Sequence, residues 1–142
     1  MTLEQARELA RLYFDEALTR GNLAVVDQIL AQDFTLFVPP SIGEGPQVEG
    51  RDAFRQLILS LRQGFPDVRF EVHDVTANED TVIVSWTMTG THAAEWQGIP
   101  PTGKHVSLPG VDVFKIAAAQ IVQERIHGDY LGFLRQLGAI PQ

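Results

Sequence analysis

The sequence predicts a single α+β domain in which helices cover one face of a mostly antiparallel sheet. Apolar residues recur at helical spacing in the first part of the chain, whereas apolar and polar residues alternate from about residue 68 to 128. Helical segments followed by a run of strands are typical of this class. With 142 residues, of which 44% are hydrophobic, the chain is long enough for one core and too short for two ordinary domains. We therefore expect residues 1–142 to form one domain.

Three helices are expected before the strand-rich region. Thr2 and Gln5 have the spacing of a capping box, and the apolar positions after them continue at helical spacing as far as Arg20. Asn22 is a suitable cap for a second, shorter helix. A third helix is predicted over 52–63, where apolar residues form one stripe and a glycine and a proline follow.

The strands are predicted from alternation and from the residues that interrupt it. A first strand over 34–38 is followed by a loop over 41–50. Four further strands form an expected antiparallel meander: 68–76, 81–92, 104–116 and 121–128. The segment 96–103 contains two prolines and is expected to be a loop that carries Trp96. Asp129 is placed to cap a last short helix, which Gly138 ends.

Composition excludes several classes of protein. A formal net charge of -7 and a pI near 4.9 argue against nucleic acid as a partner. The chain has no cysteine, and its four histidines lack the spacing of a metal site, so we expect neither a metal nor another cofactor. No apolar run is long enough to span a membrane, and the N-terminus does not resemble a signal peptide. We therefore expect a cytoplasmic protein that is not a membrane protein.

The most informative residue is an acid inside an apolar strand. Alternation places Asp112 on the same face as Phe114 and Ile116, while Lys115 points to the other face. A carboxylate among apolar neighbours is costly unless it is hydrogen-bonded, paired or exposed to a cavity, and burial would raise its pKa toward the range useful for proton transfer. Asp112 is therefore either a catalytic acid or base or a structural acid satisfied by hydrogen bonds.

Two other acids are candidates for assisting Asp112. Glu124 shares a face with Val122 and Ile126 in the last strand, so it would approach Asp112 if the two strands pair. Two carboxyl groups in one pocket push their pKa values apart. The alternative for Glu124 is a solvated acid near a strand edge. Asp129 is either an acid at the rim of the pocket or only the cap of the last helix.

The chain resembles the SnoaL-like polyketide cyclase family, within the nuclear transport factor 2-like superfamily. The motifs that carry the resemblance are Thr89-Gly90-Thr91-His92, Gly98-Ile99-Pro100-Pro101-Thr102-Gly103-Lys104, Gly110-Val111-Asp112-Val113-Phe114-Lys115-Ile116 and Leu134-Arg135-Gln136-Leu137-Gly138. The resemblance implies a cone-shaped α+β barrel, in which a curved sheet and the N-terminal helices enclose a deep apolar pocket. It also implies a homodimer that forms through the outer face of the sheet.

The resemblance further implies an enzyme that works without metal or cofactor, in which a carboxylate acts as general acid and base in an intramolecular aldol condensation. The family's acid corresponds to Ile126 here, and an assisting histidine corresponds to Asp112. An isoleucine cannot transfer a proton, so this mechanism does not carry over unchanged. Asp112 remains as an ionisable residue at one of the two positions.

Two functions follow from these observations. The first is a cofactor-independent cyclase, isomerase or dehydratase that acts on a small hydrophobic carbonyl compound, with Asp112 as the acid or base. The second is a non-catalytic module that uses the same pocket for binding or serves in dimerisation, which the isoleucine at the family's acid position favours. In both, the residues expected to line the pocket are Tyr13, Phe37, Phe54, Trp86, Met88, His92, Trp96, Phe114 and Ile126.

Overall fold

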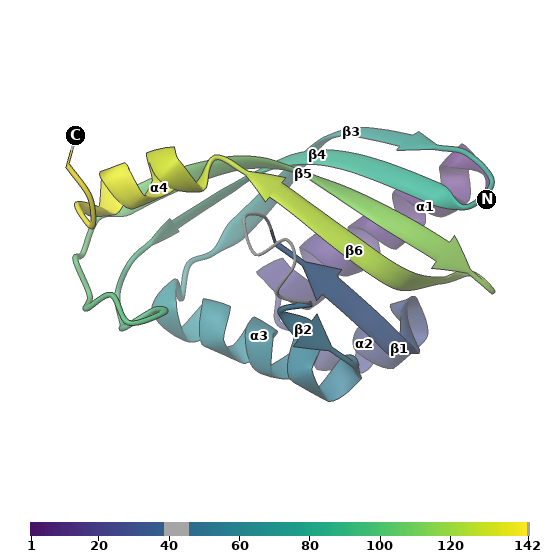
Figure 1. Ribbon diagram of the computed structural model, residues 1–142, viewed down its shortest axis with the longest axis horizontal. Coiled ribbons are helices and arrows are strands. Elements are labelled where there is room, and N and C mark those ends of the chain that lie inside the picture. The colour runs from purple at the N-terminus through teal and green to yellow at the C-terminus, as the bar shows by residue number, and fades with distance from the viewer. Residues whose placement is uncertain (39–45, 142) are drawn as a thin grey trace.

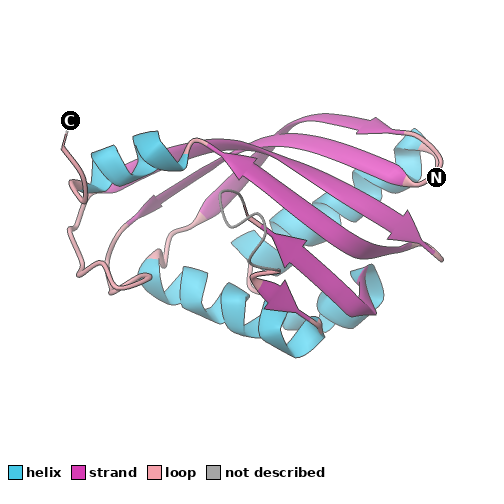
Figure 2. Ribbon diagram, in the orientation of Figure 1, coloured by secondary structure: helices cyan, strands magenta, loops and turns pink. Residues whose placement is uncertain are grey.

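A six-stranded sheet curves over a group of helices formed by the first half of the chain (Figure 1). The structure is a computed structural model, which describes residues 1–38 and 46–141. Helices α1, α2 and α3 lie on one side of the sheet, and the short helix α4 follows the last strand at one end of the molecule (Figures 1 and 2). The α+β class expected from the sequence is confirmed.

The helices begin close to the predicted positions. Helix α1 (Leu3–Ala10) starts with the expected capping box, in which the Gln5 backbone N–H donates to Thr2 Oγ1 at 3.1 Å and the Thr2 N–H donates to Gln5 Oε1 at 2.9 Å. It continues without a break as a π-helical segment, η1 (Arg11–Thr19), a widening that the spacing of apolar residues does not reveal. The remaining helices are the 3₁₀ turn η2 (Leu23–Val25), α2 (Val26–Ile29), α3 (Arg51–Gly64) and α4 (Tyr130–Leu137).

The strands follow the order β2-β1-β6-β5-β4-β3 across the sheet. Their bounds are β1 (Leu30–Phe37), β2 (Val48–Glu49), β3 (Arg69–Ala77), β4 (Thr81–Thr91), β5 (His105–Ala117) and β6 (Gln120–Gly128). Strands β3 to β6 form the predicted antiparallel meander. Strand β1 runs parallel to β6, a pairing between distant segments that local patterns cannot predict. The sheet is curved, but its edge strands β2 and β3 do not pair with each other, so it does not close into a full barrel.

Residues 41–45 of the predicted loop over 41–50 lie outside the described residues. Within its described part, Val48 and Glu49 form β2 and pair with Leu36 and Thr35 of β1. The loop interpretation is therefore wrong for these two residues, because a short pairing on the sheet edge replaces it.

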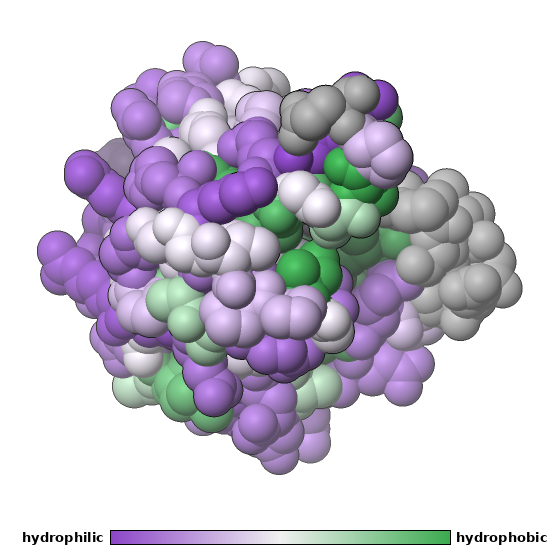
Figure 3. All heavy atoms as spheres, turned by 90° about the vertical axis from the view of Figure 1, so that its left-hand side faces the viewer, coloured by the Kyte–Doolittle hydropathy of each residue, from purple (hydrophilic) through white to green (hydrophobic). Residues whose placement is uncertain are grey.

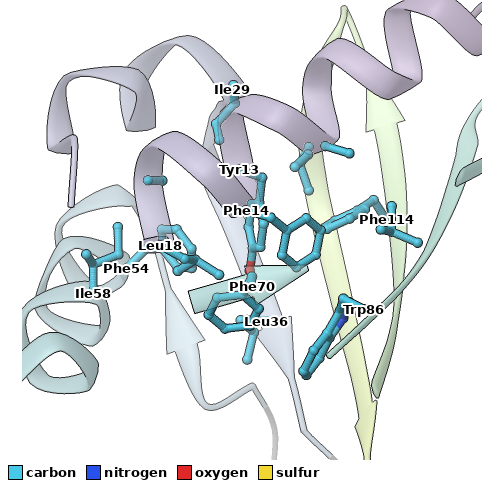
Figure 4. Close-up of a cluster of buried hydrophobic side chains, with 14 of the residues drawn as sticks. Tyr13, Phe14, Leu18, Ile29, Leu36, Phe54, Ile58, Phe70, Trp86 and Phe114 are labelled. Atoms are coloured by element: carbon cyan, nitrogen blue, oxygen red, sulfur yellow. The ribbon is translucent and has the colours of Figure 1, made fainter. Parts of the chain in front are cut away.

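An aromatic core fills the space between the helices and the sheet (Figure 4). Tyr13 and Phe14 of η1 are buried, and the Tyr13 ring lies 5.0 Å from the Phe114 ring of β5 in an edge-on arrangement. Phe54 of α3 lies 5.6 Å from Tyr13 on another side. This packing fixes η1 and α3 against the inner face of the sheet, which positions the site described next. No helix within residues 1–38 and 46–141 is long and apolar enough to cross a membrane.

Candidate active site

A cavity of about 480 Å³ opens between the inner face of the sheet, η1, α3 and α4. Its walls are mostly apolar and include Phe70 of β3, Trp86 and Met88 of β4 and Leu61 of α3. Figure 3 looks onto the end of the molecule that carries α4 and shows hydrophobic side chains set back in a depression among polar ones. A concave apolar site of this size suits a small hydrophobic molecule.

Asp112 is the one carboxyl group among the described residues that line this cavity. Its side chain is buried, with 1% of the residue exposed, as the alternation in β5 predicts. Trp86 Nε1 donates a hydrogen bond to Asp112 Oδ1 at 3.1 Å. Burial raises the pKa of Asp112 from 3.8 to about 6, although hydrogen bonds from Glu124 and Trp86 oppose the rise. Asp112 therefore changes its charge near neutral pH, where a general acid or base is most effective.

Glu124 lies directly behind Asp112. It faces Phe114 across the β5–β6 pairing and so occupies the position diagonal to Asp112 on the same face of the sheet. Glu124 is fully buried and does not line the cavity, so the interpretation of Glu124 as a solvated acid is wrong. The two carboxyl groups share a hydrogen bond. The pairing of β5 with β6 thus brings together the two acids that the sequence placed on matching faces.

Tyr13 holds Glu124 from the opposite wall. The Tyr13 hydroxyl lies 2.7 Å from Oε1 and 2.6 Å from Oε2 of Glu124 and donates to the carboxyl group. Burial, and then the nearby charge of Asp112, raise the pKa of Glu124 well above its usual value. At neutral pH the pair therefore holds one proton, with Glu124 protonated and donating to the Asp112 carboxylate. Such a pair has macroscopic pKa values that belong to both groups together.

The cavity includes five of the nine residues predicted to line it: Tyr13, Trp86, Met88, Trp96 and Ile126. The other four do not appear on its wall: Phe37, Phe54, His92 and Phe114.

Packing and strand geometry explain why these four side chains do not line the cavity. In β1, Leu36 and Val38 face the cavity, so the alternation of the strand turns Phe37 away. Phe54 and Phe114 are buried in the core behind Tyr13. His92 is fully buried outside the cavity, where its ring stacks on Phe65 at 5.3 Å.

The structure places Asp129 at the N-terminus of α4, where its Oδ1 accepts the backbone N–H of Gly132 at 2.9 Å. Asp129 is exposed and is absent from the wall of the cavity, so the geometry agrees with the capping alternative.

Sequence reasoning missed several wall residues that a helical pattern could have found. Tyr130, Phe133 and Leu134 of α4 line the cavity and have the spacing of one helix face. Leu57 and Leu61 of α3 also line it, although the sequence indicated only that their stripe is buried. In the part of the chain that the structure describes, no three His, Asp or Glu residues gather in a way that would hold a metal ion.

The family model of the SnoaL-like polyketide cyclases matches residues 8–137, which include every element that builds the cavity. The chain belongs to this family. Among curated relatives, aklanonic acid methyl ester cyclase DnrD of Streptomyces peucetius is 28% identical over 101 residues, which cover 70% of this chain and 70% of DnrD. Nogalonic acid methyl ester cyclase of Streptomyces nogalater is 28% identical over 123 residues, which cover 86% of this chain and 90% of that protein.

Solved structures of SnoaL-like proteins have the same fold. A SnoaL-like protein from Jannaschia sp. CCS1 aligns with a TM-score of 0.84 at 27% identity and covers 97% of this chain and 94% of its own. TsrD from Streptomyces laurentii aligns with a TM-score of 0.87 at 23% identity and covers 99% of each chain. The latter likeness concerns the fold alone.

The position that the resemblance assigns to the family's acid is Ile126, which faces Asp112 directly across the β5–β6 pairing and lines the cavity. In this SnoaL-like chain, the ionisable group on the wall therefore comes from β5, one strand away from the position expected in the family. The acid next to it in β6 is Glu124, two residues before Ile126 and behind the wall.

Proposed function

We propose that this protein is a cofactor-independent enzyme of the cyclase, isomerase or dehydratase kind, in which Asp112 transfers protons on a small hydrophobic carbonyl compound. One observation carries the proposal: a carboxyl group with a pKa of about 6 lies on the wall of an otherwise mostly apolar cavity. The cyclase names of the curated relatives, at 28% identity, support a reaction of this kind.

In the proposed reaction, the Asp112 carboxylate removes a proton from the carbon next to a substrate carbonyl. The electron pair of the C–H bond moves to the carbon–carbon bond, and the carbonyl oxygen becomes an enolate oxygen. In a cyclisation, the enolate carbon would then attack a second carbonyl group of the same molecule, and Asp112 would return its proton to the new alkoxide. The protein neither gains nor loses a proton over the cycle.

Glu124 and Tyr13 act on Asp112 and not on the substrate. Protonated Glu124 donates to the Asp112 carboxylate, as does Trp86 Nε1–H, so the ionised base is stabilised inside an apolar site. Tyr13 keeps the Glu124 carboxyl in place through its short hydrogen bonds. These contacts limit the rise in the pKa of Asp112, so that the base is ionised at neutral pH and still basic enough to accept a proton.

The proposal is tested with an enolisable aromatic ketone, such as 2-tetralone, whose exchange of α-hydrogen for deuterium is followed by NMR in D₂O. Asp112→Asn is expected to lower the enzyme-dependent exchange rate by about 10²-fold or more, in line with the contribution of general acids and bases. Glu71→Gln, an exposed acid of β3, is the matched control and should exchange like the wild type. Undiminished exchange in Asp112→Asn, or a wild type no faster than buffer, would contradict the proposal.

The second candidate is a binding protein that uses the same cavity without chemistry. The isoleucine on the wall at the family's acid position favours it. The position of Asp112 on the cavity wall, with a side-chain N–H of Trp86 and not a backbone group as its donor, supports the enzyme. Ligand binding by the wild type without any hydrogen exchange would favour the binding protein.

We also propose that the chain forms a homodimer through the outer face of the sheet. At the centre of this face, outward-facing Ile83 of β4 pairs with Val113 of β5. Val111 lies two residues before Val113 in β5 and points to the same face. Ile83 and Val111 are 41% and 37% exposed, unusually high for apolar residues in the middle of a sheet. Light scattering after size exclusion should give twice the 15.7 kDa of one chain, and Val111→Arg should reduce it to one. A monomeric wild type would refute this proposal.

A further inference from the structure

The wall of the cavity carries a second hydroxyl group, on Tyr130, which the reaction above leaves without a role. We propose that Tyr130 is a catalytic hydrogen-bond donor, which binds the substrate carbonyl oxygen while Asp112 removes the neighbouring proton. This inference rests on the proposed function and assigns the group that would stabilise the negative charge on oxygen. Donors aimed at such an oxygen are often the largest single contribution to catalysis.

The hydroxyl of Tyr130 is free to bind a ligand. Tyr130 lines the cavity, and its hydroxyl makes no hydrogen bond within residues 1–38 and 46–141. The other polar groups near the carboxyl pair are occupied, because Tyr13 donates to Glu124 and Trp86 donates to Asp112.

Two glutamines also lie on the wall, but neither is placed for this role. Gln47 lies on the β1–β2 side of the cavity, away from β5, where its Oε1 accepts the N–H of Val38 at 2.5 Å. Gln97 is an exposed residue in the turn after Trp96. Trp96 also carries an N–H on the wall, but Tyr130 is the donor whose ring packs against the β5–β6 pair that holds Asp112.

A glycine of β6 leaves the space for the Tyr130 ring. Gly110 of β5 and Gly128 of β6 face each other in the sheet, two residue pairs beyond Asp112 and Ile126. A Cβ atom on Gly128 would lie 3.2 Å from Cε2 and 3.3 Å from Cζ of Tyr130. The hydroxyl-bearing end of the ring therefore lies against the sheet beside Gly128.

The matching glycine on β5 is covered by the residue that binds Asp112. A Cβ atom on Gly110 would lie within 2.5 Å of Trp86 Cη2, so only glycine leaves room for the indole at its present position. Residues diagonal across a strand pair are about 7–8 Å apart, which is the relation of Asp112 to Gly128. A carbonyl group bound between the two side chains would place its oxygen near Tyr130 and its α-carbon near Asp112.

Tyr130 is held firmly by the attachment of α4 to β5. The Gln136 side chain donates to the Ser107 carbonyl oxygen at 2.8 Å and accepts the Ser107 N–H at 2.7 Å, as a neighbouring strand would. At the start of the helix, the Asp129 N–H donates to the Pro109 carbonyl oxygen at 3.1 Å. A donor fixed in this way needs little reorganisation when charge develops on the substrate.

Tyr130 also remains a donor throughout the reaction. Burial, together with the nearby carboxyl groups of Asp112 and Glu124, raises the pKa of the Tyr130 hydroxyl above its usual value. The phenol therefore keeps its proton and shares it in a hydrogen bond with the enolate oxygen. The proton removed from carbon goes to Asp112, so the charges balance without ionisation of Tyr130.

The test uses a substituted 2-naphthol with electron-withdrawing groups, which in its ionised form imitates the enolate and absorbs at a longer wavelength than the neutral form. It is carried out in Asp112→Asn, because asparagine imitates the neutral Asp112 that has already taken the proton. The 2-methoxynaphthalene with the same substituents is the control ligand, since it has the same shape and cannot ionise.

Adding Tyr130→Phe to Asp112→Asn is expected to weaken binding of the ionised naphthol by roughly 10²-fold and to leave binding of the methoxy compound within twofold. Gly128→Ala, which displaces the ring while keeping the hydroxyl, should give a smaller loss for the ionised naphthol. Equal losses for both ligands would make Tyr130 a wall residue only, and no loss would likewise overturn its role as donor.

Failure of the two proposals can be told apart. If Tyr130→Phe changes nothing while Asp112→Asn abolishes hydrogen exchange from the ketone, the proposed function stands and the role of Tyr130 falls. If neither the wild type nor Asp112→Asn binds either naphthalene, the role of Tyr130 falls, whereas the proposed function is overturned by a wild type that exchanges the ketone no faster than buffer.

Discussion

The buried carboxyl pair should make the stability of the protein fall as the pH rises. Asp112 and Glu124 have ordinary pKa values of 3.8 and 4.5, and burial raises both in the native state, that of Asp112 to about 6 and that of Glu124 further. Between about pH 5 and 6, the native state therefore keeps about one and a half protons that the unfolded chain has released. Each such proton lowers the free energy of unfolding by about 1.4 kcal/mol per pH unit.

The expected change is large enough to measure. Between pH 5 and 6 the two groups together lower the free energy of unfolding by about 2 kcal/mol per pH unit. Well above the native pKa of Asp112, only Glu124 still contributes, and the slope becomes smaller. From pH 5 to pH 7 the pair thus destabilises the protein by about 4 kcal/mol. This loss is equivalent to about 2 M of urea in the midpoint of unfolding, for a slope of ~2 kcal/mol per M.

The double variant Asp112→Asn/Glu124→Gln removes both titrations and keeps groups that accept hydrogen bonds from Trp86 and Tyr13. Urea unfolding of the wild type and the double variant at several pH values between 5 and 8 gives the difference that belongs to the pair, because the other acidic groups are common to both. Asp112→Asn alone is not a sufficient reference, since the buried Glu124 would still titrate. Parallel curves for the two proteins would refute the assignment of raised pKa values.

Three further changes have defined outcomes. Tyr13→Phe removes the hydroxyl that donates to Glu124. We expect the free energy of unfolding, measured in urea, to fall by about 1–3 kcal/mol and the pH profile of ketone exchange to shift. An unchanged profile would contradict the positioning role of Tyr13. Gly110→Ala places a methyl group against the indole of Trp86, so we expect the protein to lose about 1–3 kcal/mol of stability and its tryptophan fluorescence to change. Wild-type stability and fluorescence would mean that the indole is not confined by Gly110. In the two-residue β5–β6 turn, Ala118 and Ala119 have positive φ angles of 51° and 63°, which asparagine and glycine adopt with less strain. Ala118→Asn with Ala119→Gly should therefore add about 1 kcal/mol of stability in thermal unfolding. No gain would indicate that the turn is unstrained.

Local patterns were sufficient for most of the secondary structure and singled out the two acids, although they left the burial of Glu124 open. Caps at Thr2, Asn22 and Asp129 are set by contacts within three residues, which a sequence displays directly. Strict alternation in β5 and β6 was enough to put Asp112 and Glu124 on inward faces. The antiparallel meander then made their proximity follow from the pairing of adjacent strands.

Local patterns were insufficient for the walls of the cavity. Phe54 and Phe114 are as apolar as Trp86 and point inward, yet Tyr13 and its neighbours in η1 cover them. Which inward residues remain uncovered depends on where helices that are distant in sequence cross the sheet. The alternation of β1 did contain the signal that Leu36 and not Phe37 faces the cavity.

The sequence by itself determined the fold class, the family and the presence of an acid among apolar residues, because each depends on the order of residue types along short segments. Only the tertiary structure decided the chemistry available to that acid. The hydrogen bond from Tyr13 to Glu124 joins residues 111 positions apart, and the Tyr130 ring packs against β6 because Gly128 leaves room for it. Both depend on the distances between packed elements, and such distances are fixed only when helices and sheet close over a common core.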